Sequence, residues 1–306
     1  MSYVFGPVPS RRLGISLGVD LIPAKTCSYD CLYCQVGPTK RKIVETEAFA
    51  PVRNIVDELK ERLKSVTPDT ITLSGSGEPT LYSPLGRLIR AIKETTDIRI
   101  AILTNGSLLW KEEVRAGLLE AQIIAPTLST VFEETYRAIH RPHGDLDLRM
   151  IIEGLKALRR DFQGLIFLEV VLLSGLNDSD KEIKGLKGVI DKISPDKVQL
   201  NTVVRPPTDS RAIALDRERM EEIKNFLGNR AEVIADVPSG QRRQFFESYE
   251  DTILETARRR PMRAADLANV LNLPLEEVET LLEGLLGKGD LAAMGHGEET
   301  YYTARQ

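Results

Sequence analysis

The chain has 306 residues, of which 42% are hydrophobic and 28% charged, and its formal net charge is −4. These values are ordinary for a globular protein. No apolar run reaches the roughly 18 residues that a membrane-spanning helix needs. The first residues lack the basic-then-apolar order of a signal peptide. We therefore expect a cytoplasmic protein, built as one large domain or two.

After residue 14, short apolar runs alternate with amphipathic stretches whose apolar residues recur every three or four positions. The runs predict strands over residues 15–22, 70–73, 98–103, 122–128, 165–173, 197–204 and 231–235. The stretches predict helices over residues 51–66, 85–95, 110–120, 147–162, 181–193 and 217–227. This alternation predicts parallel strands joined by helical crossovers. The fold class is therefore α/β, as a barrel or a doubly wound sheet.

Six of the predicted strands end in polar or glycine-containing segments, at residues 27–34, 74–80, 104–107, 129–130, 174–178 and 205–207. In a parallel α/β barrel these ends meet at one face, where active sites form. For any single segment an ordinary turn is the alternative explanation. The convergence of six segments predicts a functional site at this face.

The first of these segments contains every cysteine of the chain, Cys27, Cys31 and Cys34. Three thiolates can hold three irons of a 4Fe–4S cluster and leave the fourth iron open to a small molecule. A disulfide would leave one thiol over. Structural zinc usually takes four ligands at paired short spacings, and the first histidine, His140, lies far along the chain. The spacing therefore favours a cluster, with zinc as the alternative.

The pattern changes near residue 248. Helices are expected over residues 248–260, 264–271 and 275–286, followed by a hairpin of residues 291–294 and 300–303. Three helices and a hairpin predict a winged helix–turn–helix. The expected domains are a barrel at 1–237, a linker at 238–247 and the winged helix at 248–306.

The C-terminal segment is acidic, with six basic and eleven acidic residues from Glu250 onward. Its third helix, which would read DNA, carries Glu276, Glu277, Glu279 and Glu283. Phosphate binding needs basic side chains, so DNA binding is not expected. Protein contact, homodimer formation and capping of the substrate remain open as roles for this segment.

With these motifs in place, residues 3–237 resemble the radical S-adenosylmethionine (SAM) superfamily, and more narrowly the branch related to the tRNA wyosine-synthesis enzymes. The resemblance rests on the cysteine loop and on residues 6–14, 74–81, 104–106 and 199–202. It implies a partial, TIM-like (βα)6 barrel and an oxygen-sensitive 4Fe–4S cluster. It also implies that SAM is split into a 5′-deoxyadenosyl radical, with electrons from a donor such as flavodoxin or ferredoxin.

The resemblance also assigns residues. Cys27, Cys31 and Cys34 would ligate the cluster. Contacts to SAM would come from Tyr33, Ser76, Gly77, Glu78, Asn105, Ser129, Glu169 and Asn201. The last two are polar residues inside apolar strands, where a partner or ligand is needed; a core amide for Asn201 and ordinary packing for Tyr33 are the alternatives. All these residues precede Ser248, so removing the C-terminal segment is expected to leave SAM cleavage intact.

The substrate stays open. The resemblance implies an acidic residue shortly after Ser129, which the run 127–130 lacks, and no cysteine is left for the second cluster that wyosine formation needs. Loop residues Arg11, Arg12, Arg141 and Arg205 could bind an anionic small molecule or RNA, or could be solvated surface. Three hypotheses remain: a radical SAM enzyme with an unidentified substrate, an RNA-modifying enzyme of the same chemistry, and an iron–sulfur transcription regulator that senses redox state.

Overall fold

The structure is a computed structural model that describes residues 2–234, 248–271 and 273–305. The linker predicted at 238–247 and the last three residues of the predicted barrel lie outside this range.

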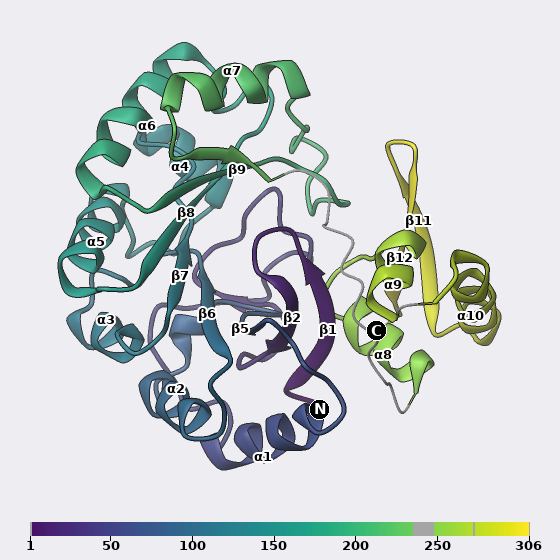
Figure 1. The fold of residues 1–306 in the computed structure, drawn as a ribbon. Helices are drawn as coiled ribbons and strands as arrows, with labels where there is room; N and C mark the ends of the chain where they lie inside the picture. Colours follow the sequence, from purple (N-terminus) through teal and green to yellow (C-terminus); the bar gives the residue numbers. More distant parts are fainter. Residues whose placement is uncertain (1, 235–247, 272, 306) are drawn as a thin grey trace.

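The central feature is an eight-stranded sheet that curves into an open barrel (Figure 1). Its strands, in spatial order, are β1 (Val4–Ser10), β2 (Gly14–Val19), β5 (Thr70–Leu73), β6 (Arg99–Thr104), β7 (Ile123–Pro126), β8 (Leu165–Val171), β9 (Lys197–Asn201) and β10 (Ala231–Val233). All neighbours from β2 to β10 are parallel, and β1 pairs antiparallel with β2. The predicted α/β fold with parallel strands is therefore confirmed.

Helices cover the outer side of this sheet (Figure 1). They are α1 (Val52–Leu63), α2 (Leu85–Lys93), α3 (Glu112–Leu118), α4 (Glu133–His140), α5 (Leu148–Asp161), α6 (Asp180–Ile193) and α7 (Arg217–Leu227). Three of them begin at a side-chain cap, because Asp147, Ser179 and Asp216 each accept a hydrogen bond from a backbone N–H of the first turn. Their apolar stripes bury against the strands and form the main hydrophobic core.

Among the strands of the large sheet and the helices that cover it, the sequence pattern missed β1 and α4. Strand β1 contains a glycine and two prolines, which argue against a strand, but it lies at the sheet edge, where proline is tolerated. The predicted strand at 15–22 is also too long: β2 ends at Val19, and the side chain of Asp20 already binds Ser76. The strands predicted to end at 128, 173 and 204 likewise stop two or three residues earlier, where the polar segments leave the sheet.

Three short elements lie between β2 and α2. A pair of two-residue strands, β3 (Thr26–Cys27) and β4 (Arg41–Lys42), brackets the cysteine loop. The short 3-10 helix η1 (Pro79–Leu81) follows β5.

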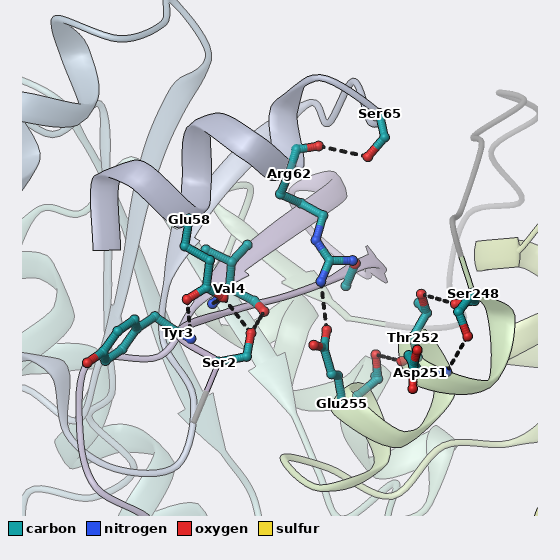
Figure 2. A network of polar contacts seen from close by, with 12 residues as sticks. Ser2, Tyr3, Val4, Glu58, Arg62, Ser65, Ser248, Asp251, Thr252 and Glu255 are labelled. Carbon is teal, nitrogen blue, oxygen red and sulfur yellow. Dashed lines mark hydrogen bonds and ion pairs between the residues drawn. The ribbon is translucent and has the colours of Figure 1, made fainter. Parts of the chain in front are cut away.

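The C-terminal segment forms three helices and a hairpin around a hydrophobic core of its own. The elements are α8 (Tyr249–Ala257), α9 (Ala264–Leu271), α10 (Leu275–Lys288), β11 (Leu291–His296) and β12 (Glu299–Ala304). Helices α8 and α9 contact β1. Figure 2 shows one link, in which Arg62 of α1 donates to Glu255 of α8 at 2.8 Å. The element order matches the predicted one, and the winged-helix assignment stays a prediction.

None of the helices in the described ranges combines the length and apolarity required to cross a membrane.

Candidate functional site

A cavity of about 340 Å³ opens where the parallel strands end. Its walls come from the turn between β1 and β2, the cysteine loop, residues of β8, and the segments that follow β5, β6, β7 and β9. Cys27, Cys31 and Cys34 all line it. Four of the six predicted segments therefore contribute to it, 27–34, 74–80, 104–107 and 205–207, whereas no residue of 129–130 or 174–178 does.

The cysteine loop is held by backbone hydrogen bonds rather than by its own secondary structure. The N–H of Leu32 donates to the carbonyl of Ile139 at 2.9 Å, and the N–H of Asp30 donates to that of His140 at 3.0 Å. On the other side, the hydroxyl of Thr208 donates to the carbonyl of Cys34 at 2.5 Å. Helix α4 and the segment after β9 therefore position the three thiols.

The three thiols line one cavity and could supply the three thiolate ligands of a 4Fe–4S cluster. Within the described ranges, no group of three His, Cys, Asp or Glu side chains could hold a single metal ion. Burial raises the pKa of Cys27 to about 12, and binding to a metal is what would deprotonate such thiols.

His140 is a residue of this site that the sequence pattern did not single out. It ends α4, is buried, and places Nδ1 3.4 Å from Cys31 Sγ and 3.3 Å from the Tyr33 hydroxyl. Burial lowers its pKa to about 3, so the ring is neutral. Nothing in the local sequence separates a histidine that faces a cysteine from an ordinary core histidine.

Gly77 and Glu78 line the cavity as predicted, and hydrogen bonds hold the Glu78 carboxylate from several sides. Its Oε1 accepts from the backbone and hydroxyl of Thr80 at 3.0 and 2.6 Å and from Thr104 at 2.6 Å, and its Oε2 accepts from the N–H of Asn105 at 2.7 Å. A carboxylate oxygen has about two acceptor sites, so Oε2 keeps one of them. Burial raises the pKa of Glu78 above its ordinary value, although these hydrogen bonds act to lower it. Its structural effect is to join the segment after β5 to the segment after β6.

Asn105 also lines the cavity and contacts the cysteine loop. Its side-chain amide donates to the hydroxyl of Ser28 at 2.9 Å and lies 3.5 Å from Cys27 Sγ. A donor to a cysteine sulfur is one means by which proteins tune an iron–sulfur cluster.

Glu169 and Asn201 form one network with two arginines. The amide of Asn201 donates to Glu169 at 2.9 Å and accepts from Arg11 at 2.9 Å, while Arg12 lies 3.3 Å from Glu169. Burial alone would raise the pKa of Glu169, but Arg12, Asn201 and Arg11 hold it below its ordinary value. The network explains why a buried strand can carry a carboxylate.

Tyr33 lines the cavity, and three other predicted residues do not. Ser76 binds Asp20, with its hydroxyl donating at 2.6 Å. The Ser129 hydroxyl accepts from the N–H of Val171 at 3.1 Å. Arg141 ends α4 in a left-handed conformation and pairs with Asp30 and Asp209. These three side chains lie outside the cavity lining. The sequence could not show this, because the local order of residues does not indicate which way a loop side chain points.

Arg205 lines the cavity as expected, and so does Arg260, which follows α8 in the C-terminal segment. The residues assigned to the cluster and SAM all precede Ser248, but the cavity wall also includes a residue of the C-terminal segment. No sequence signal separated Arg260 from its neighbours Arg258 and Arg259, which a helix C-terminus favours by itself.

Comparison with known proteins relates this chain to a protein family. A family model described as the radical SAM superfamily matches residues 21–186. A UPF0026 protein of Methanocaldococcus jannaschii is 33% identical over 312 residues, which cover 99% of this chain and 96% of that protein. A protein named GTPase Obg from Brachyspira hyodysenteriae is 44% identical over 237 residues. That match covers 77% of this chain, and the chain spans only 35% of that protein's length.

Solved structures share the fold at low identity. A radical SAM methyltransferase from Sphaerobacter thermophilus matches with a TM-score of 0.55 and 19% identity, over 71% of this chain and 65% of its own. TYW1 with a lysine–pyruvate adduct bound matches with a TM-score of 0.52 and 18% identity, over 73% of this chain and 75% of its own.

The radical SAM superfamily uses a 4Fe–4S cluster and S-adenosylmethionine. The match of its model to more than half of the chain, together with the full-length relative, shows that this chain belongs to the radical SAM superfamily and to the UPF0026 proteins.

Proposed function

We propose that this chain is an enzyme that uses a 4Fe–4S cluster and SAM to abstract a hydrogen atom from a substrate. The bound cluster would pass one electron from a flavodoxin- or ferredoxin-like donor to SAM, whose C5′–S bond breaks into methionine and a 5′-deoxyadenosyl radical. The observation that carries the proposal is that Cys27, Cys31 and Cys34 line one cavity with Gly77 and Asn105. We expect this chemistry in the cytoplasm, where thiols stay reduced.

In this proposal, different residues bind the cluster and contact SAM. The three cysteines would hold the cluster, and Asn105 would donate to the sulfur of Cys27. Glu78 would keep the Asn105 loop in place through Oε2, which also keeps one acceptor site for the SAM amino group. The backbone of Gly77, which lines the same cavity, would be a second group available to that amino group.

An RNA-modifying enzyme of the same chemistry is the second candidate. The observation that favours it is the group of four arginines in the cavity wall, Arg11, Arg12, Arg205 and Arg260, which suits an anionic substrate. The wyosine-forming reaction itself is not proposed, because the chain has three cysteines in all. A winged-helix regulator is less supported, since Glu276, Glu277, Glu279 and Glu283 are exposed along α10.

Anaerobic reconstitution tests the proposal. The protein should bind about four irons and four sulfides per chain, and substitution of any one cysteine by serine should remove most of them. After reduction, SAM should yield 5′-deoxyadenosine and methionine in equal amounts, and a sample without reductant is the control. An intact cluster that gives no deoxyadenosine under strong reductant would favour the regulator, and stoichiometric zinc without sulfide would exclude the enzyme.

A further inference from the structure

The four arginines of the cavity wall differ in what their guanidinium groups contact. Arg11 donates to Asn201, and Arg12 contacts Glu169 and the side-chain oxygen of Gln199. Both are thus held by the network described above. The other two, Arg205 and Arg260, keep N–H groups that no part of this network uses.

These idle donors are buried. Nε and Nη2 of Arg260, and Nε of Arg205, are shielded from solvent and have no hydrogen-bond partner among the described residues. Each side chain is half-buried as a whole, and it is these particular atoms that are shielded. A buried donor without a partner is costly, and a native structure that keeps three of them needs an explanation.

The geometry of Arg260 indicates what would satisfy it. Nε and Nη2 present two parallel N–H bonds along one edge of the guanidinium plane, which is the edge that binds two oxygens of one carboxylate or phosphate. Arg205 donates Nη1 to Gln35 of the cysteine loop at 3.2 Å. Burial, and then the charge of Arg205, lower the pKa of Arg260 to about 9. An anion bound between the two guanidinium groups would offset both the burial of the Arg260 charge and its repulsion by Arg205.

Contacts between the C-terminal segment and the barrel hold both arginines in place. Next to Arg260, Arg259 donates to Asp20 at 3.2 Å and to the carbonyl of Ser2 at 2.6 Å. Next to Arg205, the carbonyl of Val204 accepts a hydrogen bond from the hydroxyl of Tyr301 on β12 at 2.5 Å. The carboxylate of Asp266 on α9 offsets part of the positive charge of Arg205 and Arg260, but its hydrogen bond is with Arg263, at 2.9 Å. The cavity thus has its full wall only when the C-terminal segment is docked.

We propose that Arg205 and Arg260 bind an oxyanion group of the substrate, a phosphate or a carboxylate, and that the C-terminal segment is part of the substrate-binding site through Arg260. This inference rests on the proposed function and specifies its substrate class. Gly77, Glu78 and Asn105, which are expected to bind SAM, follow β5 and β6, whereas Arg205 follows β9. Asn201, also expected to contact SAM, is the last residue of β9, so the experiment below includes SAM binding as a separate measurement.

Anion binding to the reconstituted full-length protein tests this assignment without any SAM cleavage. Inorganic phosphate or acetate, added at constant ionic strength, should raise the thermal midpoint in a saturable way, because a ligand that binds only the folded state stabilises it. Arg260→Gln and Arg205→Gln should each weaken the response about tenfold, as expected for the loss of charge-assisted hydrogen bonds. The double variant should be little weaker than either single one, since both side chains bind the same group.

Controls separate binding from folding. Arg258→Gln, at an exposed neighbour of the same helix end, should behave like wild type. Without anion, Arg260→Gln should keep or raise the wild-type midpoint, because it removes an unpaired buried charge. Saturation by phosphate alone identifies a phosphate, and saturation by acetate also identifies a carboxylate; either supports the proposal.

Three outcomes overturn it: no response to either anion, an unchanged response in Arg260→Gln, or additive losses in the double variant. If Arg260→Gln instead weakens equilibrium binding of SAM about tenfold, the arginines serve the SAM carboxylate and the substrate assignment falls. Failure of the proposed function looks different, because absent deoxyadenosine with intact anion binding leaves this site in place.

Discussion

At the level of single residues, polar side chains inside the barrel are held by partners that lie far away in the sequence. Glu169 is the clearest case, since it meets Arg12 from the first turn and Asn201 from a neighbouring strand. The side chains of Arg12 and Glu169 are only 12% and 15% exposed, so solvent screens the pair little. Sequence reasoning found Glu169 and Asn201 as polar residues in apolar strands, and the structure adds that they satisfy each other.

Glu169→Gln tests the energetic role of this network. We expect the apo-protein to lose about 1–3 kcal/mol of unfolding free energy at pH 7, because Arg12 and Arg11 lose a buried counter-charge. The folded-state pKa of Glu169 lies below its ordinary 4.5. Its contribution is therefore complete above that value and is lost as the pH falls through the folded-state pKa. Urea unfolding at several pH values should show the wild-type advantage shrinking below about pH 4.5.

Glu134→Gln, on the exposed face of α4, serves as the control and should leave stability unchanged. A stability difference that is the same at acid and neutral pH would contradict the electrostatic explanation.

At the scale of elements, the cavity depends on loops that pack backbone against backbone. The N–H of Glu78 donates to the carbonyl of Thr26, directly before Cys27. A Cβ on Gly77 would lie 2.0 Å from that same oxygen. Only glycine fits there, so the segment after β5 and the strand that carries Cys27 are positioned together.

Gly77→Ala should therefore separate these two segments. We expect a loss of about 1–3 kcal/mol in unfolding free energy from overpacking, together with weaker SAM binding and less iron per chain after reconstitution. Gly188→Ala is the matched control, because Gly188 is exposed on α6 and a Cβ there meets nothing within 4 Å. That variant should gain about 0.5–1 kcal/mol through helix propensity. Equal stability of the two variants would refute the close-packing explanation.

At the scale of the whole molecule, the C-terminal segment is coupled to the barrel near the predicted SAM site. Arg259 packs over the ring of Phe5, with its guanidinium carbon 4.6 Å from the ring centroid, and binds Asp20. Asp20 in turn accepts from the hydroxyl and backbone N–H of Ser76 at 2.6 and 3.1 Å. Docking of the segment therefore supports the loop that contains Gly77.

Arg259→Ala should loosen this docking. Because charged hydrogen bonds contribute about 1.5–3 kcal/mol each, we expect earlier proteolysis between the two cores and a several-fold loss of SAM affinity. Arg258→Ala is the control, since Arg258 is exposed. Wild-type SAM affinity in Arg259→Ala would contradict this coupling and support the sequence-based expectation that the C-terminal segment is dispensable for SAM cleavage.

The charge of the C-terminal segment makes a separate prediction. The exposed glutamates of α10 should repel a phosphate backbone, so the full-length chain should bind duplex DNA no more tightly than about 1 µM at moderate salt. Fluorescence anisotropy across a salt series measures this. Nanomolar, sequence-selective binding would revive the regulator hypothesis.

Features that arise from local order could be predicted from the amino-acid sequence. Periodicity predicted the α/β alternation because burial imposes one repeat on helices and another on strands, and the cysteine spacing indicated the cluster chemistry. Strand β1 was missed because its prolines and glycine oppose a strand locally, and it is supported by pairing with β2 and by contacts with α8 and α9, which are distant in the sequence.

The set of side chains that meet at the cavity became visible only once the elements were packed together. Arg260 lies about 250 residues from Arg11 in the sequence, and both line the same wall. His140 contacts Cys31 because α4 packs beside the cysteine loop. Ser129 points away because its hydroxyl binds Val171. Side-chain direction and long-range contact depend on how separate elements pack, and no local pattern in the chain encodes that packing.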